Sequence, residues 1–89
     1  MSDSLKEVHR LFPVGSLATH ASYANELLLE VKAHRLMPEG ERMWKIESLV
    51  FIVGTLYPTI WPPKTEQWIP PENMRPVSNP LVVIALASL

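Results

Sequence analysis

The sequence predicts a small all-α domain, with an antiparallel pair of helices, short N- and C-terminal helices, and a proline-rich extended arm. Two observations favour helices: apolar residues recur at helical spacing over residues 17–37 and 39–57, and capping residues stand at two expected helix starts, Ser4 and Asn79. The arm follows from a third observation, because seven of the nine prolines fall within residues 55–80, where no regular helix can continue.

The first predicted helix covers residues 4–12. Ser4 and Glu7 have the spacing of a capping box, in which each side chain bonds the backbone amide at the other position. Apolar residues then fall on one helical face, and Pro13 ends the helix.

The two longer helices are predicted over residues 17–37 and 39–57, and Pro38 and Gly40 end the first of them. In the first, the apolar stripe follows the 3.6-residue period of a helix, with Ser16 as its cap. The second becomes apolar on every side from Leu49 onward, which is typical of a helix that enters an enclosed environment. A strand is the alternative for this last part, because residues 50–53 (VFIV) are strong β formers.

Residues 58–80 are predicted to form the proline-rich arm. Proline cannot occupy a helix interior or a central strand, and the residue before each proline favours extended geometry. Large apolar side chains are nevertheless spaced along this segment, which argues against disorder. We expect the arm to lie in grooves, either on its own helices or on another chain.

The chain is predicted to end in a short helix and to form a single domain over residues 1–89. Asn79 and Pro80 suit the N-cap and first position of a helix. Residues 81–89 are uncharged and almost wholly apolar, so we expect them to pack against other apolar residues. A strand is the alternative for this segment.

Composition narrows the range of partners. The chain has 89 residues, of which 47% are hydrophobic and 19% charged, and its formal charge is −1. A weakly charged surface promotes association, and scattered basic residues do not favour nucleic acid as the partner. The lack of cysteine and of a signal peptide leads us to expect a cytoplasmic protein, and membrane binding is expected at most as peripheral contact.

No residues are grouped in a way that predicts catalysis. Glu30 and His34 have the i, i+4 spacing of helical metal ligands, but the sequence supplies no further ligands beside them. The three glycines stand alone, so no phosphate-binding loop is expected. We therefore expect no enzyme activity, no catalytic residues, no cofactor and no metal.

The motif Gly54-Thr55-Leu56-Tyr57-Pro58 resembles the short motif that opens the recognition helix of PadR-type winged-helix repressors. The resemblance covers five residues and implies a DNA-binding helix at this point. The chain departs from the family downstream, where Pro62 and Pro63 interrupt the next turn and the only basic residues are Lys64 and Arg75. No family is assigned on this motif.

The function predicted from these features is non-catalytic protein–protein interaction, as a small oligomeric, adaptor or accessory subunit, an inhibitory factor included. The partner is another protein or a second copy, and we expect a homo-oligomer. The alternative is a small regulator that binds DNA or an apolar ligand. The interaction residues expected on the arm and the C-terminal segment are Tyr57, Ile60, Trp61, Trp68, Ile69, Met74, Leu81 and Ile84.

We predict at most weak, salt-sensitive binding to DNA, because eight basic residues face nine acidic ones and no basic cluster is present. A gel-shift titration at physiological salt checks this. Tight, sequence-selective binding would instead support the DNA-binding alternative.

Overall fold

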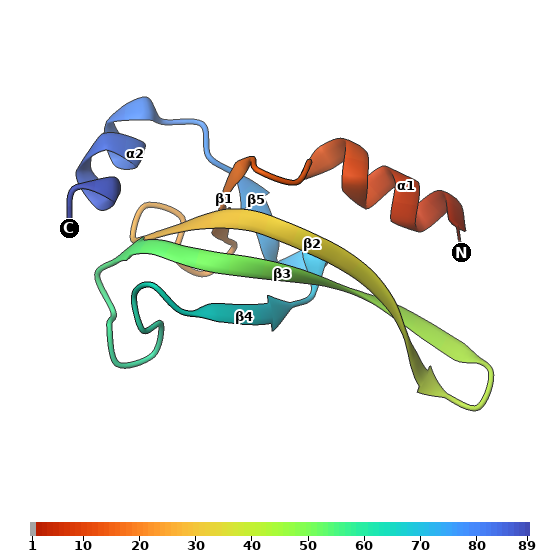
Figure 1. The fold of residues 1–89 in the computed structure, drawn as a ribbon. Coiled ribbons are helices and arrows are strands. Elements are labelled where there is room, and N and C mark those ends of the chain that lie inside the picture. The colour runs from red at the N-terminus through yellow and green to blue at the C-terminus, as the bar shows by residue number, and fades with distance from the viewer. Residues whose placement is uncertain (1) are drawn as a thin grey trace.

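The structure is a computed structural model that describes residues 2–89, with side chains from residue 5, and it is a β-sheet protein. Within these residues, five antiparallel strands form one sheet in the order β4-β3-β2-β1-β5. The strands are β1 (Leu17–His20), β2 (Leu27–Gly40), β3 (Met43–Thr55), β4 (Glu66–Ile69) and β5 (Met74–Pro76). A helix stands at each end of the chain, α1 (Ser2–Leu11) and α2 (Pro80–Ala87), and a 3₁₀ turn, η1 (Pro71–Asn73), joins β4 to β5 (Figure 1). The all-α prediction is therefore wrong.

The predicted helix pair is in fact the long hairpin of β2 and β3. The fully buried residues Ser48, Val50 and Ile52 alternate with partly exposed ones along β3, which is the two-residue period of a strand. Every third or fourth residue here is also apolar, so the sequence satisfies the helical period as well. The β-branched residues and the turn at Glu41 and Arg42 decide the outcome, and the strand alternative for residues 49–57 is the correct one as far as Thr55.

Residues 17–37 likewise do not form a helix. They contain β1, a turned segment over 21–26, and most of β2, in which Leu27, Leu29 and Val31 are fully buried. β2 has register shifts against β3 between Leu28 and Leu29, between Val31 and Ala33, and between Pro38 and Gly40. Such bulges bend and twist a strand, so they contribute curvature to the sheet.

The sheet is strongly curled, because its two edge strands are joined by a short connection. Five strands laid flat would place β4 and β5 roughly 19 Å apart. Only residues 70–73 lie between Ile69 and Met74, and three of them form η1, which advances only about 2 Å per residue. The connection can reach from one edge to the other only if the edges approach each other, so the sheet encloses its core as an open barrel does.

The core lies on the inner face of this curled sheet. Its buried members come from most of the chain: Phe12, Ala18, Leu27, Leu29, Val31, Val50, Ile52, Trp61, Ile69 and Met74. Tyr23 packs against them. A core drawn from the first loop, all five strands and the loop before β4 makes those segments interdependent.

The predicted arm is part of this fold. β4 pairs with β3 through Ser48–Ile69 and Phe51–Glu66, and β5 pairs with β1 through Ala18–Pro76. Residues 58–80 are thus not an extended arm on a helical domain. Only Pro76 of this segment's prolines lies in a strand, and it is tolerated because β5 is an edge strand, where one side of the backbone needs no partner. The others lie in loops, in the connection that contains η1, and at the start of α2.

Both terminal helices are confirmed. α1 begins two residues before the expected start, so Ser4 lies within the helix; its side chain is outside the described ones. At the C-terminus, Asn79 caps α2 by accepting a hydrogen bond from the Leu81 amide at 3.0 Å, and Pro80 occupies the first turn. The GTLYP motif opens no helix, since Gly54 and Thr55 end β3 and Leu56–Pro58 begin a loop.

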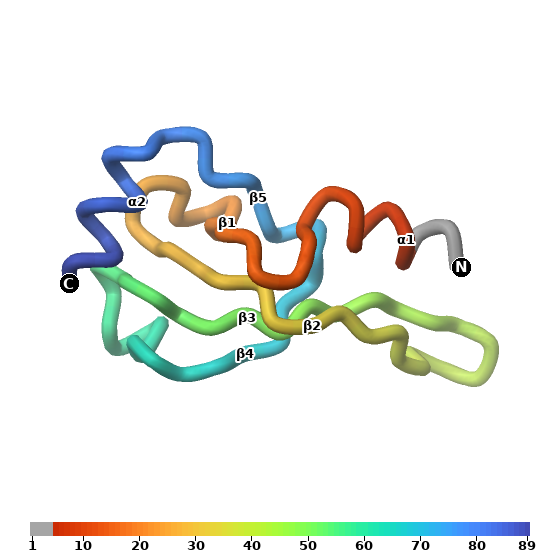
Figure 2. Tube along the Cα trace, turned by 45° about the horizontal axis from the view of Figure 1, so that its top comes forward, coloured from red at the N-terminus to blue at the C-terminus, as the bar shows by residue number. Residues whose placement is uncertain are grey.

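The helices lie at opposite ends of the sheet (Figure 1). α1 lies along the part of the β2–β3 hairpin that projects past the other strands, formed by residues 32–40 and 43–47 and called here the hairpin extension (Figure 2). α2 covers the other end of β2 and β3. Among the described residues, no helix is long and apolar enough to cross a membrane.

Gly54 allows α2 to rest directly on β3. A Cβ atom at this position would stand 1.8 Å from the backbone oxygen of Leu86, the one buried residue of α2. The helix backbone cannot move aside as a side chain can, so only glycine fits this contact.

We predict that Gly54→Ala displaces α2 and lowers the free energy of unfolding by about 1–3 kcal/mol, the usual cost of overpacking. Denaturant unfolding and hydrogen exchange of the α2 amides measure both effects. Gly40→Ala is the matched control, because no atom lies within 4 Å of its added Cβ and its φ is not positive. Equal stability of the two variants would contradict the close-contact role of Gly54.

Candidate functional site

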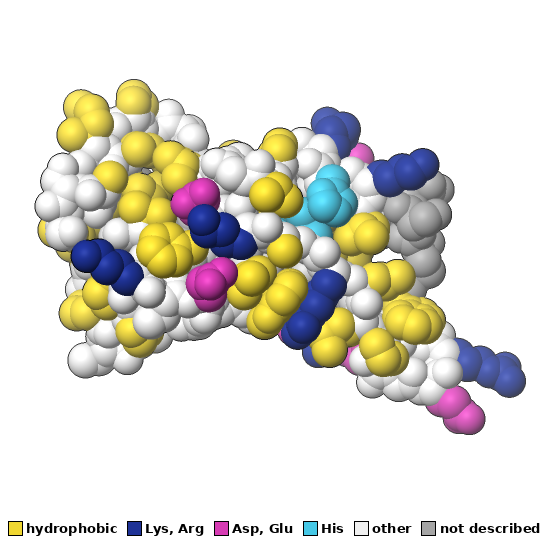
Figure 3. Space-filling model, viewed as in Figure 1, with side chains coloured by type: hydrophobic (Ala, Val, Ile, Leu, Met, Phe, Trp, Pro, Cys, Tyr) yellow, Lys and Arg dark blue, Asp and Glu magenta, His cyan; other side chains and the backbone are white. Residues whose placement is uncertain are grey.

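The first candidate site is an exposed apolar surface on α2. This helix carries no charged residue, and a helix that is apolar on every side is ordinarily enclosed. Here only Leu86 is buried, while Leu81, Ile84 and the following Leu89 are 71%, 65% and 68% exposed. Together with the exposed Leu56 they form what we call the α2 surface; apolar side chains gather over this end of the molecule in Figure 3.

A shallow hollow of about 290 Å³ opens within the α2 surface. Leu56, Leu81 and Leu89 line it together with other apolar residues of α2, and Asn25 is its only polar lining residue among those described. A hollow with so few polar groups suits an apolar side chain better than a charged or strongly polar ligand.

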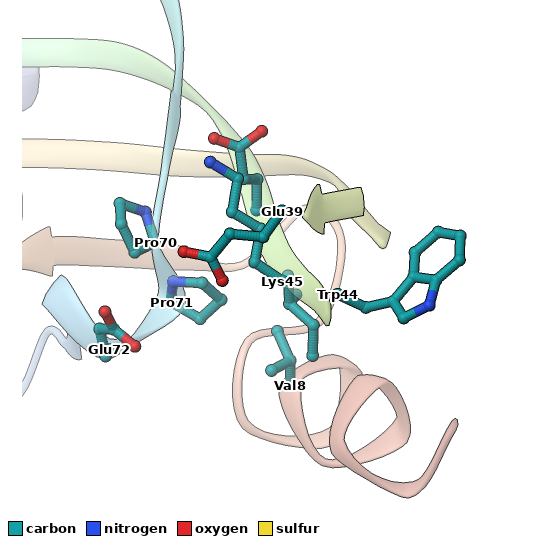
Figure 4. Close-up of a pocket in the computed structure, with 9 residues that line it drawn as sticks. Val8, Glu39, Trp44, Lys45, Pro70, Pro71 and Glu72 are labelled. Carbon is teal, nitrogen blue, oxygen red and sulfur yellow. The ribbon is translucent and has the colours of Figure 1, made fainter. Parts of the chain in front are cut away.

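The second candidate site is a cleft of about 600 Å³ beside the hairpin extension, called here the hairpin cleft. Val8 enters it from α1, Trp44 and Ile46 come from β3, and Pro70 and Pro71 come from the connection after β4. In Figure 4 the two prolines lie across the cleft from Trp44, whose ring points away from them. Sequence segments that are far apart therefore meet here.

The charges around the hairpin cleft are mainly negative. Glu39, Glu47 and Glu72 line it, against Lys45 alone. Glu47 is held by Arg35, whose Nη2 lies 2.8 Å from its carboxylate. No ion pair engages Glu39 or Glu72 within the described part of the chain.

Arg35 also ties the outer face of the sheet together. Its guanidinium carbon lies 3.7 Å from the centroid of the Trp68 ring. This places a cation over the face of an indole, a favourable electrostatic contact, and joins β2 to β4 across β3. Trp68 thus supports the edge strand that ends at the hairpin cleft.

His34 attaches the end of α1 to the sheet. Its Nε2 lies 2.6 Å from the Phe12 carbonyl oxygen and its Nδ1 lies 2.7 Å from the Ser48 hydroxyl. A carbonyl only accepts, so Nε2 carries the proton, and in the neutral ring Nδ1 accepts from Ser48. Partial burial lowers the pKa of His34, and the nearby His9 adds to this, against the opposing effect of the Phe12 hydrogen bond.

His20 is also held in its neutral form. Its Nδ1 accepts a hydrogen bond from the Ser22 amide at 3.0 Å, which a protonated nitrogen could not do. Partial burial, and then the nearby Arg75, lower the pKa of His20. Its ring packs on Trp61, with 5.3 Å between ring centroids, so it borders the core.

The eight interaction residues expected from the sequence are divided between core and surface. Trp61, Ile69 and Met74 belong to the chain's own core. Trp68 is half-buried beneath Arg35, while Tyr57 and Ile60 are exposed in the loop after β3. Only Leu81 and Ile84 lie on the α2 surface.

Sequence reasoning did not identify the hairpin cleft. Its contributors, such as Glu39 and Glu72, are distant in the chain and come together only when the sheet curls. One signal was present: the segment Pro38-Glu39-Gly40-Glu41-Arg42 combines proline, glycine and charge, which mark a turn between two strands.

The metal site that the sequence could have formed at Glu30 and His34 is not assembled. Among the described side chains, no three or more His, Asp and Glu groups stand close enough together to hold a metal ion. Glu30 and His34, which a helix would place on one face, instead lie on a strand, and Glu30 pairs with Lys32. The expectation that the chain has no cofactor remains a prediction.

Comparison with protein-family models, with curated proteins and with solved structures finds no match to this chain. The class that the fold defines is a small, curled five-stranded antiparallel sheet with a helix at each end.

We predict that the protein loses stability as the pH falls below about 6.5, the ordinary pKa of histidine. The folded-state pKa values of His20 and His34 are both lowered, so the unfolded chain binds more protons in this range. Their contribution is complete above pH 6.5 and is lost as the pH falls toward the folded values.

Denaturant unfolding at several pH values between 8 and 5, with NMR titration of the histidine rings, measures this effect. The double variant His20→Gln, His34→Gln should lose most of the pH dependence. Ring pKa values above 6.5 in the folded protein, or greater stability at pH 5, would contradict the assignment.

Proposed function

We propose that the chain is a non-catalytic protein–protein interaction module of the cytoplasm, a small oligomeric or accessory subunit that associates through the α2 surface. The observation that carries this proposal is that α2 is apolar on all sides but buries only Leu86. Exposed apolar surface of this kind is typical of sites that another protein covers.

Burial of the α2 surface would supply the favourable free energy of association. Fully burying one leucine or isoleucine side chain is worth about 1.5–3 kcal/mol relative to leaving it in water. Leu56, Leu81, Ile84 and Leu89 are each more than half exposed, so most of this contribution is still available to a partner. Part of it is offset by the loss of translational and rotational freedom on binding.

A second copy of the chain is the partner that the surface suits best. Residues 77–89 contain no charged side chain, and the whole chain carries a formal charge of −1, so two copies repel each other weakly. A two-fold interface brings the same surface together from both copies. The apolar hollow beside Leu81 offers each copy room for an apolar side chain of the other.

We predict a concentration-dependent mass in solution that the double variant Leu81→Glu, Ile84→Glu reduces to that of the monomer. Two carboxylates on each copy would have to be buried in the interface, at a prohibitive cost. Sedimentation velocity over a wide concentration range measures the mass, and circular dichroism checks that the fold is kept.

Val14→Glu is the matched control for this experiment. Val14 is also an exposed apolar residue, at 58%, but it lies in the loop between α1 and β1. The control should associate like the unaltered protein. A protein that remains monomeric at millimolar concentration, or a control that dissociates equally, would contradict association through α2.

A further inference from the structure

The outer edge of β3 is unpaired along the hairpin extension. β4 pairs with residues 48–51 of β3, starting at Ser48 and Ile69. Beyond Ile69 the ladder would continue with Pro70 and Pro71, but proline has no amide hydrogen and η1 turns the chain away toward β5. Residues 43–47 of β3 therefore have a strand partner on the β2 side only, within the part of the chain that the structure describes.

The groups that this edge offers can be identified from the pairing farther along β3. Ile52 directs both its amide and its carbonyl toward the β4 side, where they bond Thr65 and Lys64 at 2.9 and 2.8 Å. Residues of an antiparallel strand alternate in the side to which these groups point. Ile46 and Trp44 therefore present their amide and carbonyl groups at the free edge, and both residues line the hairpin cleft.

The hairpin cleft has the room and the length for one more short strand. Its volume is about 600 Å³, and five residues of β3 extend for roughly 17 Å. Pro70 and Pro71 bound the cleft at the end of β4, and Val8 of α1 also lines it. An added strand would occupy the place beside β3 that β4 leaves.

Charge determines the kind of segment that fits. Glu39 and Glu72 line the cleft without an ion-pair partner among the described residues, whereas Glu47 is engaged by Arg35. Lysine or arginine side chains on an added strand would meet these two carboxylates. A second copy's β3 fits less well, because its residues 43–47 carry one lysine and one glutamate and so bring no net positive charge to these two carboxylates.

We propose that the hairpin cleft binds an extended, lysine- or arginine-bearing peptide segment of a partner protein by strand addition to β3 at Trp44 and Ile46. The main-chain hydrogen bonds give affinity, and Glu39 and Glu72 select basic side chains, as in other cases of strand addition. This site is separate from the α2 surface, so it does not depend on self-association.

The test is an NMR titration of the full chain with a blocked hexapeptide of alternating lysine and valine. We expect amide shifts centred on Trp44 and Ile46, with the α2 amides unchanged. The same peptide methylated on every backbone nitrogen keeps its charges but cannot donate backbone hydrogen bonds, so it should not bind. A hexapeptide of alternating glutamate and valine should not bind either.

The double variant Glu39→Gln, Glu72→Gln should bind the lysine peptide about three- to tenfold more weakly, as expected for two exposed ion pairs. Glu66→Gln is the control, because this exposed carboxylate lies on β4 and outside the cleft lining. Absence of binding at millimolar peptide, equal binding of the methylated peptide, or shifts confined to α2 would overturn the proposal.

Discussion

The pairing of β2 with β3 is the interaction on which the rest of the structure depends. It extends from Leu27–Thr55 to Gly40–Met43 and places these strands at the centre of the sheet. β1 and β4 are each added to one side of this hairpin, α1 is fastened to it through His34, and α2 rests on Gly54. The α2 surface lies at one end of this hairpin and the hairpin cleft lies toward the other, so the hairpin sets the distance between the two candidate sites.

The short connection from β4 to β5 is the second constraint, and it links the core to the cleft. The curl that it imposes encloses the apolar inner face, which a chain of this size needs in order to bury enough surface. The same proline-containing connection ends β4 early and leaves part of β3 without a neighbour. One segment therefore both completes the core and exposes a strand edge.

The sequence was sufficient to predict the two terminal helices but not the sheet between them. Asn79 caps α2 and Pro80 stands in its first turn, and both effects involve only neighbouring residues, so the start of α2 could be predicted without knowing the fold. The hairpin residues are apolar at both the helical and the strand period, so periodicity alone does not distinguish a helix from the paired strands that form. The sequence predicts both Ile84 and Trp61 as interaction residues, yet Ile84 is exposed and Trp61 lies in the core. Sequence reasoning could not distinguish them, because Trp61 is buried only by the curl of the sheet.

The pairing of β1 with β5 affects the order in which the chain can fold. Ala18 of β1 pairs with Pro76 of β5, so β1 cannot complete its pairing until residues 74–76 are in place. Closing so large a loop delays folding relative to a helical bundle of the same size. During synthesis, the leucines of β2 emerge well before Met74 and Leu86, which complete their cover. The nascent chain therefore presents unburied strand surface until residues 74–86 have left the ribosome, and exposed strand surface of this kind is prone to aggregation.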